Sequence, residues 1–293
     1  MHKFTLSLHG GKAGTPPPSD FKPVKFERGD VEGWSHKSAR NNADWLRSVD
    51  FDALDGLSYS FTGTIKDCPP TSADWHSVRR SFIERLRRRG LIRAHWVTEW
   101  QRRGVPHLHG ALWFPSDIPP AEVMRFVVEQ WLAVTKQYGS TLSAQHMNVI
   151  YDALGWAQYT CKHAARGVTH YQRSPENIPV EWRYKTGRVW GKVGDWVVCE
   201  PFTLQSNSEV FWRYRRLVRA WRKADARKSG NPFRIKKART MLRCSKIGLS
   251  RVRGVNEWLS LDDSLLLLHC AGENSSYSKI EQVWSSDDGE SAK

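Results

Sequence analysis

The sequence predicts an α+β fold built on an antiparallel sheet. Segments with the alternation of strands are mixed with segments of helical periodicity, and no steady alternation of strand and helix runs through the 293 residues. Two neighbouring strand segments are joined by a short turn, which is typical of a hairpin and excludes a parallel crossover between them. With 40% hydrophobic residues and 15 Trp, the chain can bury a large core.

The first part of the chain is expected to hold a leader, one helix and one strand. Residues 1–35 are interpreted as a flexible leader, because Gly and Pro cluster between residues 10 and 23. A helix is predicted over residues 38–49, with Trp45 facing inward. Residues 57–65 alternate and are rich in Ser, Tyr, Phe and Thr, which predicts a strand.

A helix and a hairpin are expected next. Ser72 is a suitable N-cap for a helix over residues 73–89, which carries large apolar side chains at helical spacing. Residues 91–100 and 106–114 have the pattern of strands, and the short segment between them contains Gly104. This arrangement predicts a β-hairpin.

The remaining elements again mix the two types. In order, they are a helix over residues 122–137 that follows two prolines, a short strand over 146–150, a helix over 152–165, a segment over 183–198 that fits a strand pair or a loop equally well, and basic helices beyond residue 203.

The net charge of +15 is concentrated in one segment. Between Glu209 and Arg253 the chain has 16 Lys or Arg and only two acidic residues, so this segment alone carries +14. Such a block is typical of a surface that binds a polyanion, of which nucleic acid is the commonest. A solvated helical face is the alternative. A membrane surface is disfavoured because the block lacks a clean apolar face.

Other features of composition exclude several classes of protein. No apolar run approaches the roughly 20 residues that cross a bilayer, and the N-terminus lacks the apolar stretch of a signal peptide. We therefore expect a cytoplasmic protein with no membrane partner. The five cysteines are widely spaced and form no CxxC pair, which indicates neither a zinc knuckle nor a disulfide framework.

The first group of candidate functional residues is His107-Leu108-His109. On a strand, the two histidines point to one face of the sheet. If the hairpin turn is centred on Arg103, Glu99 lies opposite His107 and diagonal to His109, at about 4.5–5.5 Å for the direct pair. One carboxylate and two imidazoles can hold a metal ion and leave positions open for substrate. A half-buried histidine pair without a metal is the alternative.

The second group lies in the helix expected over residues 152–165. Tyr159 and Lys162 are three positions apart and therefore share a helix face. An ammonium group beside a tyrosine favours the phenolate, or stabilises charge on a phosphate under attack. The pair is therefore suited to transesterification of a phosphodiester. A helix with an inward tyrosine and a solvated lysine is the alternative.

Three stretches together resemble the motifs of the HUH endonucleases, in particular the rolling-circle replication initiators of single-stranded DNA phages and plasmids. The first motif is matched by LSYSFT at residues 57–62, the histidine motif by VPHLHGAL at residues 105–112, and the tyrosine helix by YTCK at residues 159–162. The resemblance covers somewhat over a third of the chain, and the histidine stretch is its most specific part.

This resemblance implies a central antiparallel sheet of about five strands with flanking helices. It implies Mg²⁺ or Mn²⁺ at His107 and His109, with Glu99 matching an upstream carboxylate ligand by position. It also implies a covalent 5′-phosphotyrosine on Tyr159, formed with single-stranded DNA at an origin hairpin or duplex. Because the chain has no GxxxxGK[ST] phosphate loop, a host helicase would unwind the DNA, and a host DNA polymerase is the second expected partner.

The number of tyrosines departs from part of the family. Some phage initiators carry two tyrosines one helical turn apart, whereas the residue four positions before Tyr159 is Gly155, and Tyr151 is two turns away. A single-tyrosine enzyme is therefore predicted. A second protomer, water or the displaced 3′-OH are then the candidates for a second cleavage.

Basic side chains are expected to contact the DNA backbone. Arg102 and Arg103 lie in the hairpin turn. The C-terminal candidates are Arg213, Arg215, Arg216, Arg219, Arg222, Lys223, Lys236 and Lys237. The expected domains are the leader over residues 1–35, an endonuclease domain over 36–203, a basic helical DNA-binding region over 204–270 and a disordered acidic and Ser-rich tail over 271–293.

Two alternatives use the same chemistry, and one does not. A single-strand transposase would not need the long basic region, and relaxases often carry their tyrosine upstream of the histidine motif, so both are disfavoured. From another class, the chain fits a non-enzymatic nucleic-acid-binding regulator whose histidines are structural. Loss of nicking in a Tyr159→Phe variant that still binds DNA distinguishes the enzyme from the regulator.

Overall fold

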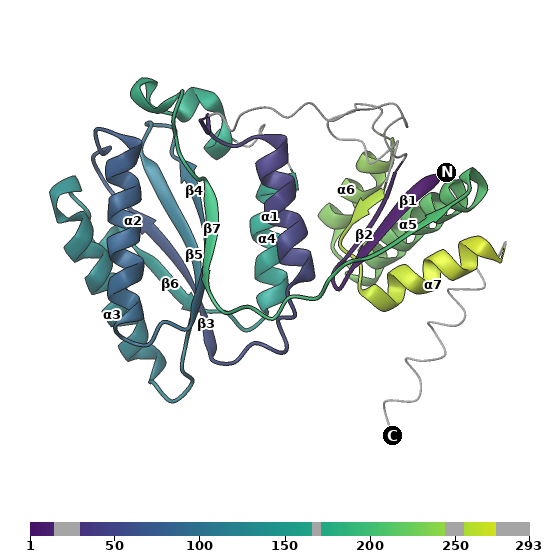
Figure 1. Ribbon diagram of the computed structural model, residues 1–293, viewed down its shortest axis with the longest axis horizontal. Coiled ribbons are helices and arrows are strands. Elements are labelled where there is room, and N and C mark those ends of the chain that lie inside the picture. Colours follow the sequence, from purple (N-terminus) through teal and green to yellow (C-terminus); the bar gives the residue numbers. More distant parts are fainter. Residues whose placement is uncertain (15–29, 166–170, 244–254, 274–293) are drawn as a thin grey trace. The chain divides into compact units, whose positions relative to one another are not determined.

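The computed structural model of the chain describes residues 1–14, 30–165, 171–243 and 255–273 (Figure 1). The chain divides into two compact units. The larger unit comprises Val24–Leu46 and Asp50–Val198, and the smaller unit comprises Met1–Pro23, Arg47–Val49 and Cys199–Lys293. Within the described ranges, no helix combines the length and the apolar character that a membrane crossing requires.

The larger unit is built on a five-stranded antiparallel sheet, which confirms the predicted α+β class. Its strand order is β6-β3-β5-β4-β7, and all four neighbouring pairs are antiparallel. Strands β4 and β5 form the predicted hairpin, and Gly104 in their turn has a φ of 78°, which glycine adopts without strain. The strands are β3 (Leu57–Thr64), β4 (Arg93–Trp100), β5 (Pro106–Phe114), β6 (His146–Val149) and β7 (Trp190–Gly194).

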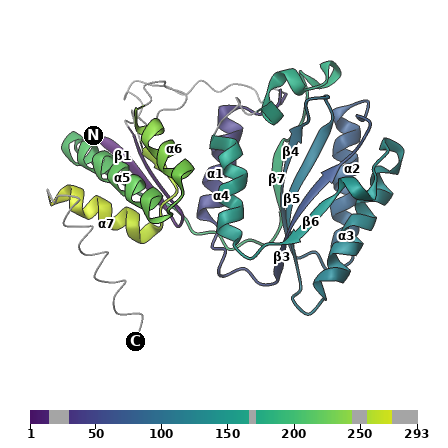
Figure 2. The same ribbon diagram turned by 180° about the vertical axis from the view of Figure 1, so that it is seen from behind.

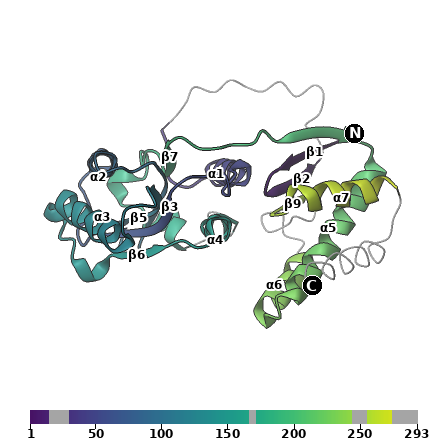
Figure 3. The same cartoon turned by 90° about the horizontal axis from the view of Figure 1, so that it is seen from below.

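Helices cover both faces of this sheet (Figure 3). Helices α2 (Ser72–Arg87) and α3 (Pro120–Thr135) lie on one face, and α1 (His36–Ser48) and α4 (Ala153–Ala165) lie on the other. The first face is packed with aromatic rings, and the second carries His95 between Trp45 of α1 and Trp156 of α4. The sheet is therefore the middle layer of three.

Helix α2 begins one residue earlier than predicted. Its N-cap is Thr71, whose Oγ1 accepts a hydrogen bond from the Asp74 backbone N–H at 3.2 Å. The Asp74 carboxylate accepts in return from the Thr71 backbone N–H at 3.0 Å. This reciprocal capping box satisfies two backbone donors, whereas Ser72 is already helical and donates to the Lys185 carbonyl.

Trp131 of α3 lies at the centre of the α2/α3 face. It is fully buried, and its ring centroid lies 5.2 to 5.9 Å from those of Phe61, Trp75 and Phe82. We expect Trp131→Ala to lower the free energy of unfolding by about 3–5 kcal/mol, because it leaves a large cavity in the core. Urea denaturation measures this. Arg125→Ala on the exposed side of the same helix should change it by less than about 0.5 kcal/mol, and equal effects would contradict the packing.

The smaller unit shows that the prediction of a flexible leader was wrong for residues 2–14. These residues form two strands in a four-stranded sheet of order β8-β1-β2-β9. Alternation along β1 turns Phe4 inward, where its ring contacts Phe211 and Tyr214 of α5. The further elements are β1 (His2–Ser7), β2 (Gly10–Gly14), β8 (Phe202–Ser206), α5 (Ser208–Lys228), α6 (Pro232–Arg243), β9 (Val255–Glu257) and α7 (Leu261–Gly272).

The basic region is accordingly helical and also contains strands. Helices α5 and α6 carry the basic residues as predicted, but β8 and β9 join the N-terminal strands by antiparallel pairing. Their register, with His2 opposite Ser206, could not be read from local pattern. The rest of the leader, at residues 15–29, and the tail from residue 274 onward lie outside the described residues.

Candidate functional site

The two histidines of β5 lie on the sheet face that α1 and α4 cover. Glu99 is four positions after His95 on β4, so both side chains point to the same face. His95 contacts the Trp156 ring of α4, with 5.9 Å between ring centroids, which identifies this face. Glu99 is paired with His107 in the register, and paired residues share a face.

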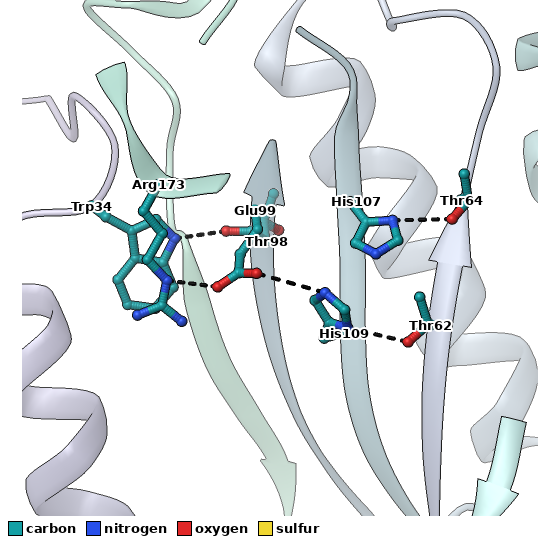
Figure 4. Close-up of polar contacts among 8 residues, drawn as sticks. All are labelled: Trp34, Thr62, Thr64, Thr98, Glu99, His107, His109 and Arg173. Atoms are coloured by element: carbon teal, nitrogen blue, oxygen red, sulfur yellow. Dashed lines mark hydrogen bonds and ion pairs between the residues drawn. The ribbon is translucent and has the colours of Figure 1, made fainter. Parts of the chain in front are cut away.

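The register of the hairpin is the one that the sequence predicted. Glu99 lies directly opposite His107, and Val97 lies opposite His109. The Glu99 carboxylate oxygen Oε2 is 3.6 Å from Nε2 of His109, and the two histidine ring centroids are 4.4 Å apart (Figure 4). The structure therefore brings the three predicted metal ligands together.

Each histidine is oriented by a threonine of β3. Nδ1 of His107 lies 3.0 Å from Oγ1 of Thr64, and Nδ1 of His109 lies 3.1 Å from Oγ1 of Thr62 (Figure 4). Since Nδ1 is engaged on both rings, a metal ion would be bound through Nε2. Sequence reasoning placed Thr62 at the end of a motif without a role and missed Thr64. Their alternation on a strand next to the histidine strand is the signal that could have found them.

Burial keeps the His107 imidazole neutral. Only 7% of the residue is exposed, and desolvation, followed by the charge of His109, lowers the pKa of His107 to about 3, against an opposing effect of Glu99. The neutral imidazole is the form that binds metal ions. Burial alone therefore prepares this ring as a ligand at neutral pH.

Glu99 has a partner that sequence reasoning missed. Nε of Arg173 donates a 2.6 Å hydrogen bond to Glu99 Oε1, and the two side chains are 1% and 3% exposed. Arg173 ends the short 3₁₀ helix η4 (Tyr171–Arg173). Its guanidinium carbon lies 3.8 Å from the centroid of the Trp34 ring, and Trp34 Nε1 donates to the Thr98 carbonyl at 2.7 Å. No local pattern marks either residue.

The donor set fits a divalent cation, but its coordination shell is incomplete. Two imidazoles and a carboxylate are suitable ligands. The 3.6 Å between Glu99 Oε2 and His109 Nε2 is slightly more than the separation of two ligands on one ion, about 3–3.5 Å for bonds of about 2.1 Å. Within the described ranges, no three His, Cys, Asp or Glu side chains form a group that could hold an ion as they stand. The donors are thus oriented toward one another without forming a closed site.

The threonine contacts lead to a testable prediction. Thr64→Val keeps the shape of the side chain and removes the partner of His107 Nδ1. We expect it to weaken Mn²⁺ binding by about 10–100-fold, which is typical for the loss of a group that orients a ligand. Isothermal titration calorimetry measures the affinity. Ser60→Ala is the control, because Ser60 lies on the same strand face and donates instead to the Asn148 carbonyl. Equal affinities in the two variants would contradict an orienting role.

Tyr159 lies on the helix that covers the histidine face. It is 58% exposed and follows Trp156, which contacts His95, by one helical turn. Helix α4 leaves β6 and runs along the sheet toward the end that carries Glu99 (Figures 1 and 2). Three helical residues advance about 4.5 Å, and Val97, level with His109, is about 7 Å beyond His95 along its strand. Tyr159 is therefore placed between the level of His95 and that of His109.

The start of α4 favours a single tyrosine. Tyr151 precedes the helix and is 94% exposed. Asp152 Oδ1 accepts a 2.7 Å hydrogen bond from the Gly155 N–H, and a Cβ at Gly155 would lie 2.1 Å from Asp152 Oδ2. A tyrosine at this position would therefore displace the capping carboxylate. Lys162 lies in α4, but its side chain is outside the described structure.

The two arginines of the hairpin turn differ in their surroundings. Arg103 donates to the backbone carbonyls of Ile65 and Lys66 and to the Gln101 side chain, so it braces the turn. Arg102 is exposed, and its guanidinium lies 5.1 Å from the centroid of the Tyr171 ring. Of the two, Arg102 is the one that is accessible for a phosphate contact.

Two of the predicted basic residues of α5 are held in ion pairs. Arg213 pairs with Glu209 at 2.5 Å, and Arg222 pairs with Glu257 of β9. Both guanidinium groups are mostly covered, at 21% and 19% exposure. These arginines stabilise the smaller unit, and a contact with DNA would have to compete with their carboxylate partners.

The other basic candidates are more open. Arg215 lies over the Trp212 ring at 5.2 Å, and burial and the nearby Arg219 lower the pKa of Arg215. The remaining candidates are Arg216, Lys223 and Lys236, which are exposed, Arg219, which is partly exposed, and Lys237, whose side chain is outside the described structure.

Comparison with known proteins matches the same stretch of chain. The sequence profile of a replication-associated protein family, described by the names ORF2 and gene 2 protein, matches residues 58–167, which include Glu99, both histidines and Tyr159. The replication-associated protein of Pseudomonas phage Pf3 is 47% identical over 268 residues, which are 92% of this chain and 94% of that protein. No solved structure matches the chain.

Two further relatives come from Xylella fastidiosa and are named as putative replication proteins. The one from strain 9a5c is 46% identical over 277 residues, which are 92% of this chain and 96% of the relative. The one from strain Temecula1 is 46% identical over 267 residues, which are 89% of this chain and all of the relative. Since these relatives match nearly end to end, the chain belongs to this family of phage and plasmid replication-associated proteins and is a replication initiator of the rolling-circle Rep type.

Proposed function

We propose that this initiator nicks and rejoins single-stranded DNA at a rolling-circle origin, with Tyr159 as the nucleophile. The observation that carries the proposal is that the tyrosine helix and the His107–His109–Glu99 group share one face of the sheet. An exposed tyrosine beside a polar group that suits a divalent cation is the arrangement that cleavage by transesterification requires.

In the proposed step, the Tyr159 hydroxyl oxygen attacks the phosphorus of the scissile phosphodiester. A bond forms between tyrosine and phosphorus, and the bond to the 3′ oxygen breaks. The tyrosine hydroxyl loses its proton, and the departing oxygen gains one, so that a 5′-phosphotyrosine and a free 3′-OH result. Because one phosphodiester replaces another, attack by a 3′-OH reverses the step and rejoins the strand.

Mg²⁺ or Mn²⁺ bound at His107, His109 and Glu99 would polarise the phosphate oxygens. Thr62 and Thr64 direct the histidines toward that task. Lys162, one turn after Tyr159, is proposed to stabilise the phenolate or the attacked phosphate. Arg102 is proposed to contact the DNA backbone from the hairpin turn.

The proposed partners are origin DNA, a host helicase and a host DNA polymerase, within the cytoplasm of a bacterial cell. The basic residues of α5 and α6 supply positive charge for the duplex or hairpin part of the origin. A relaxase or a transposase would use the same chemistry. The relatives are named for replication, and this favours the initiator.

The test uses end-labelled single-stranded oligonucleotides that tile both strands of the replicon encoding the chain. The full-length protein is incubated with each of them and Mn²⁺ and resolved on a denaturing gel. We expect one strand to give a covalent protein–DNA adduct, which disappears with EDTA and returns when Mn²⁺ is restored. If no oligonucleotide gives an adduct while duplex DNA is still bound, the nicking proposal fails and a non-enzymatic DNA-binding regulator takes its place.

A further inference from the structure

We infer that Arg173 is a positioning residue that sets the orientation of the Glu99 carboxylate for metal binding. The inference rests on the metal site of the proposed function. It assigns a role to a buried arginine that lies 74 positions after Glu99 in the sequence. It also lies beyond residues 58–167, the part that the family profile matches.

The contact between the two residues involves one carboxylate oxygen only. Arg173 Nε donates to Oε1 of Glu99 at 2.6 Å, and Oε2 is directed at His109 Nε2, 3.6 Å away (Figure 4). The two terminal nitrogens of Arg173 are buried and have no hydrogen-bond partner among the described residues. A bidentate pair would occupy both carboxylate oxygens. The single contact therefore leaves Oε2 directed at the histidines.

A ring stacked on the guanidinium fixes the direction of this contact. The Trp34 ring lies 3.8 Å from the guanidinium carbon, and only 4% of Trp34 is exposed. Trp34 Nε1 donates to the carbonyl of Thr98, the residue before Glu99 on β4. The brace thus starts and ends on the same strand, so Arg173 has little freedom to follow Glu99 if the carboxylate turns.

Charge and orientation oppose each other here, and we expect orientation to dominate. The guanidinium repels a divalent cation nearby, so its removal would strengthen metal binding if charge were the main effect. Its removal also leaves a carboxylate that is 3% exposed without its partner. Loss of a group that orients a ligand typically weakens metal binding by about 10–100-fold. The sign of the measured change therefore distinguishes the two effects.

The experiment measures Mn²⁺ affinity by isothermal titration calorimetry on the full-length protein without DNA. We expect Arg173→Gln to weaken binding by about tenfold or more. We expect Arg173→Lys to weaken it less, because lysine keeps the charge and one donor but cannot stack in the same way. Arg79→Gln is the matched control, since Arg79 is also covered and lies 3.6 Å from the Trp96 ring, on the other face of the sheet.

A second readout separates positioning from a loss of fold. The adduct yield of Arg173→Gln should recover at raised Mn²⁺, and its thermal unfolding without metal should remain a single transition. If Arg173→Gln does not fold, Arg173→Lys decides, and an affinity equal to that of the wild type overturns the inference. Affinity that is unchanged or tighter in a folded Arg173→Gln also overturns it. If instead the wild type binds Mn²⁺ equally well with and without His107, the metal site of the proposed function fails, which is a different result.

Discussion

Replacing Tyr159 with phenylalanine is expected to abolish the covalent protein–DNA adduct and to leave DNA binding within about twofold of the wild type. Phenylalanine keeps the ring and removes only the hydroxyl oxygen that attacks the phosphorus. Loss of a nucleophile typically costs about 10⁴-fold or more in rate. Because Tyr159 is 58% exposed, its hydroxyl does not support the core, and the fold should be retained. A denaturing gel measures the adduct, and fluorescence anisotropy measures binding.

Two other exposed tyrosines near the site serve as controls for this result. Tyr151 is 94% exposed and precedes α4, and Tyr171 is 47% exposed and lies beside Arg102. Tyr151→Phe and Tyr171→Phe should both keep the adduct. An adduct that persists in Tyr159→Phe and disappears in one of the other two would move the nucleophile to that residue.

The second large effect is expected from His107→Ala. This variant removes an imidazole that burial keeps neutral and that Thr64 orients. We expect Mn²⁺ binding to fall below detection and the adduct rate to fall by about 100-fold or more, since the ion supplies several kcal/mol of charge stabilisation. Calorimetry measures the first quantity and a time course on denaturing gels measures the second.

The control for this variant is His36→Ala at the exposed start of α1. His36 lies in the same unit and belongs to no predicted site, so its loss should leave both measurements unchanged. If His107→Ala keeps the Mn²⁺ affinity of the wild type, the histidines are structural. The alternative from the sequence, a half-buried pair without a metal, would then be correct.

Local pattern in the sequence was sufficient for the core of the larger unit. Alternating residues and a short turn predicted the β4–β5 hairpin, and the length of the turn set its register. The pairing of Glu99 with His107 followed directly, because cross-strand neighbours in a hairpin depend only on the turn. Helical spacing likewise placed Tyr159 and Lys162 on one helix. The exception was the cap of α2, where Thr71 and Ser72 are both good N-cap types and only the partner Asp74 distinguishes them.

Other features depended on tertiary structure, because they join segments that are far apart in the chain. The pairing of His2 with Ser206 turned an expected leader into part of a sheet, and β7 became an edge strand only through its pairing with β4. Packing of α4 on the sheet brought Tyr159 to the histidine face. The contact of Arg173 with Glu99 has no local signal at all, since a buried ion pair follows from the burial of both partners and from no periodicity in either segment.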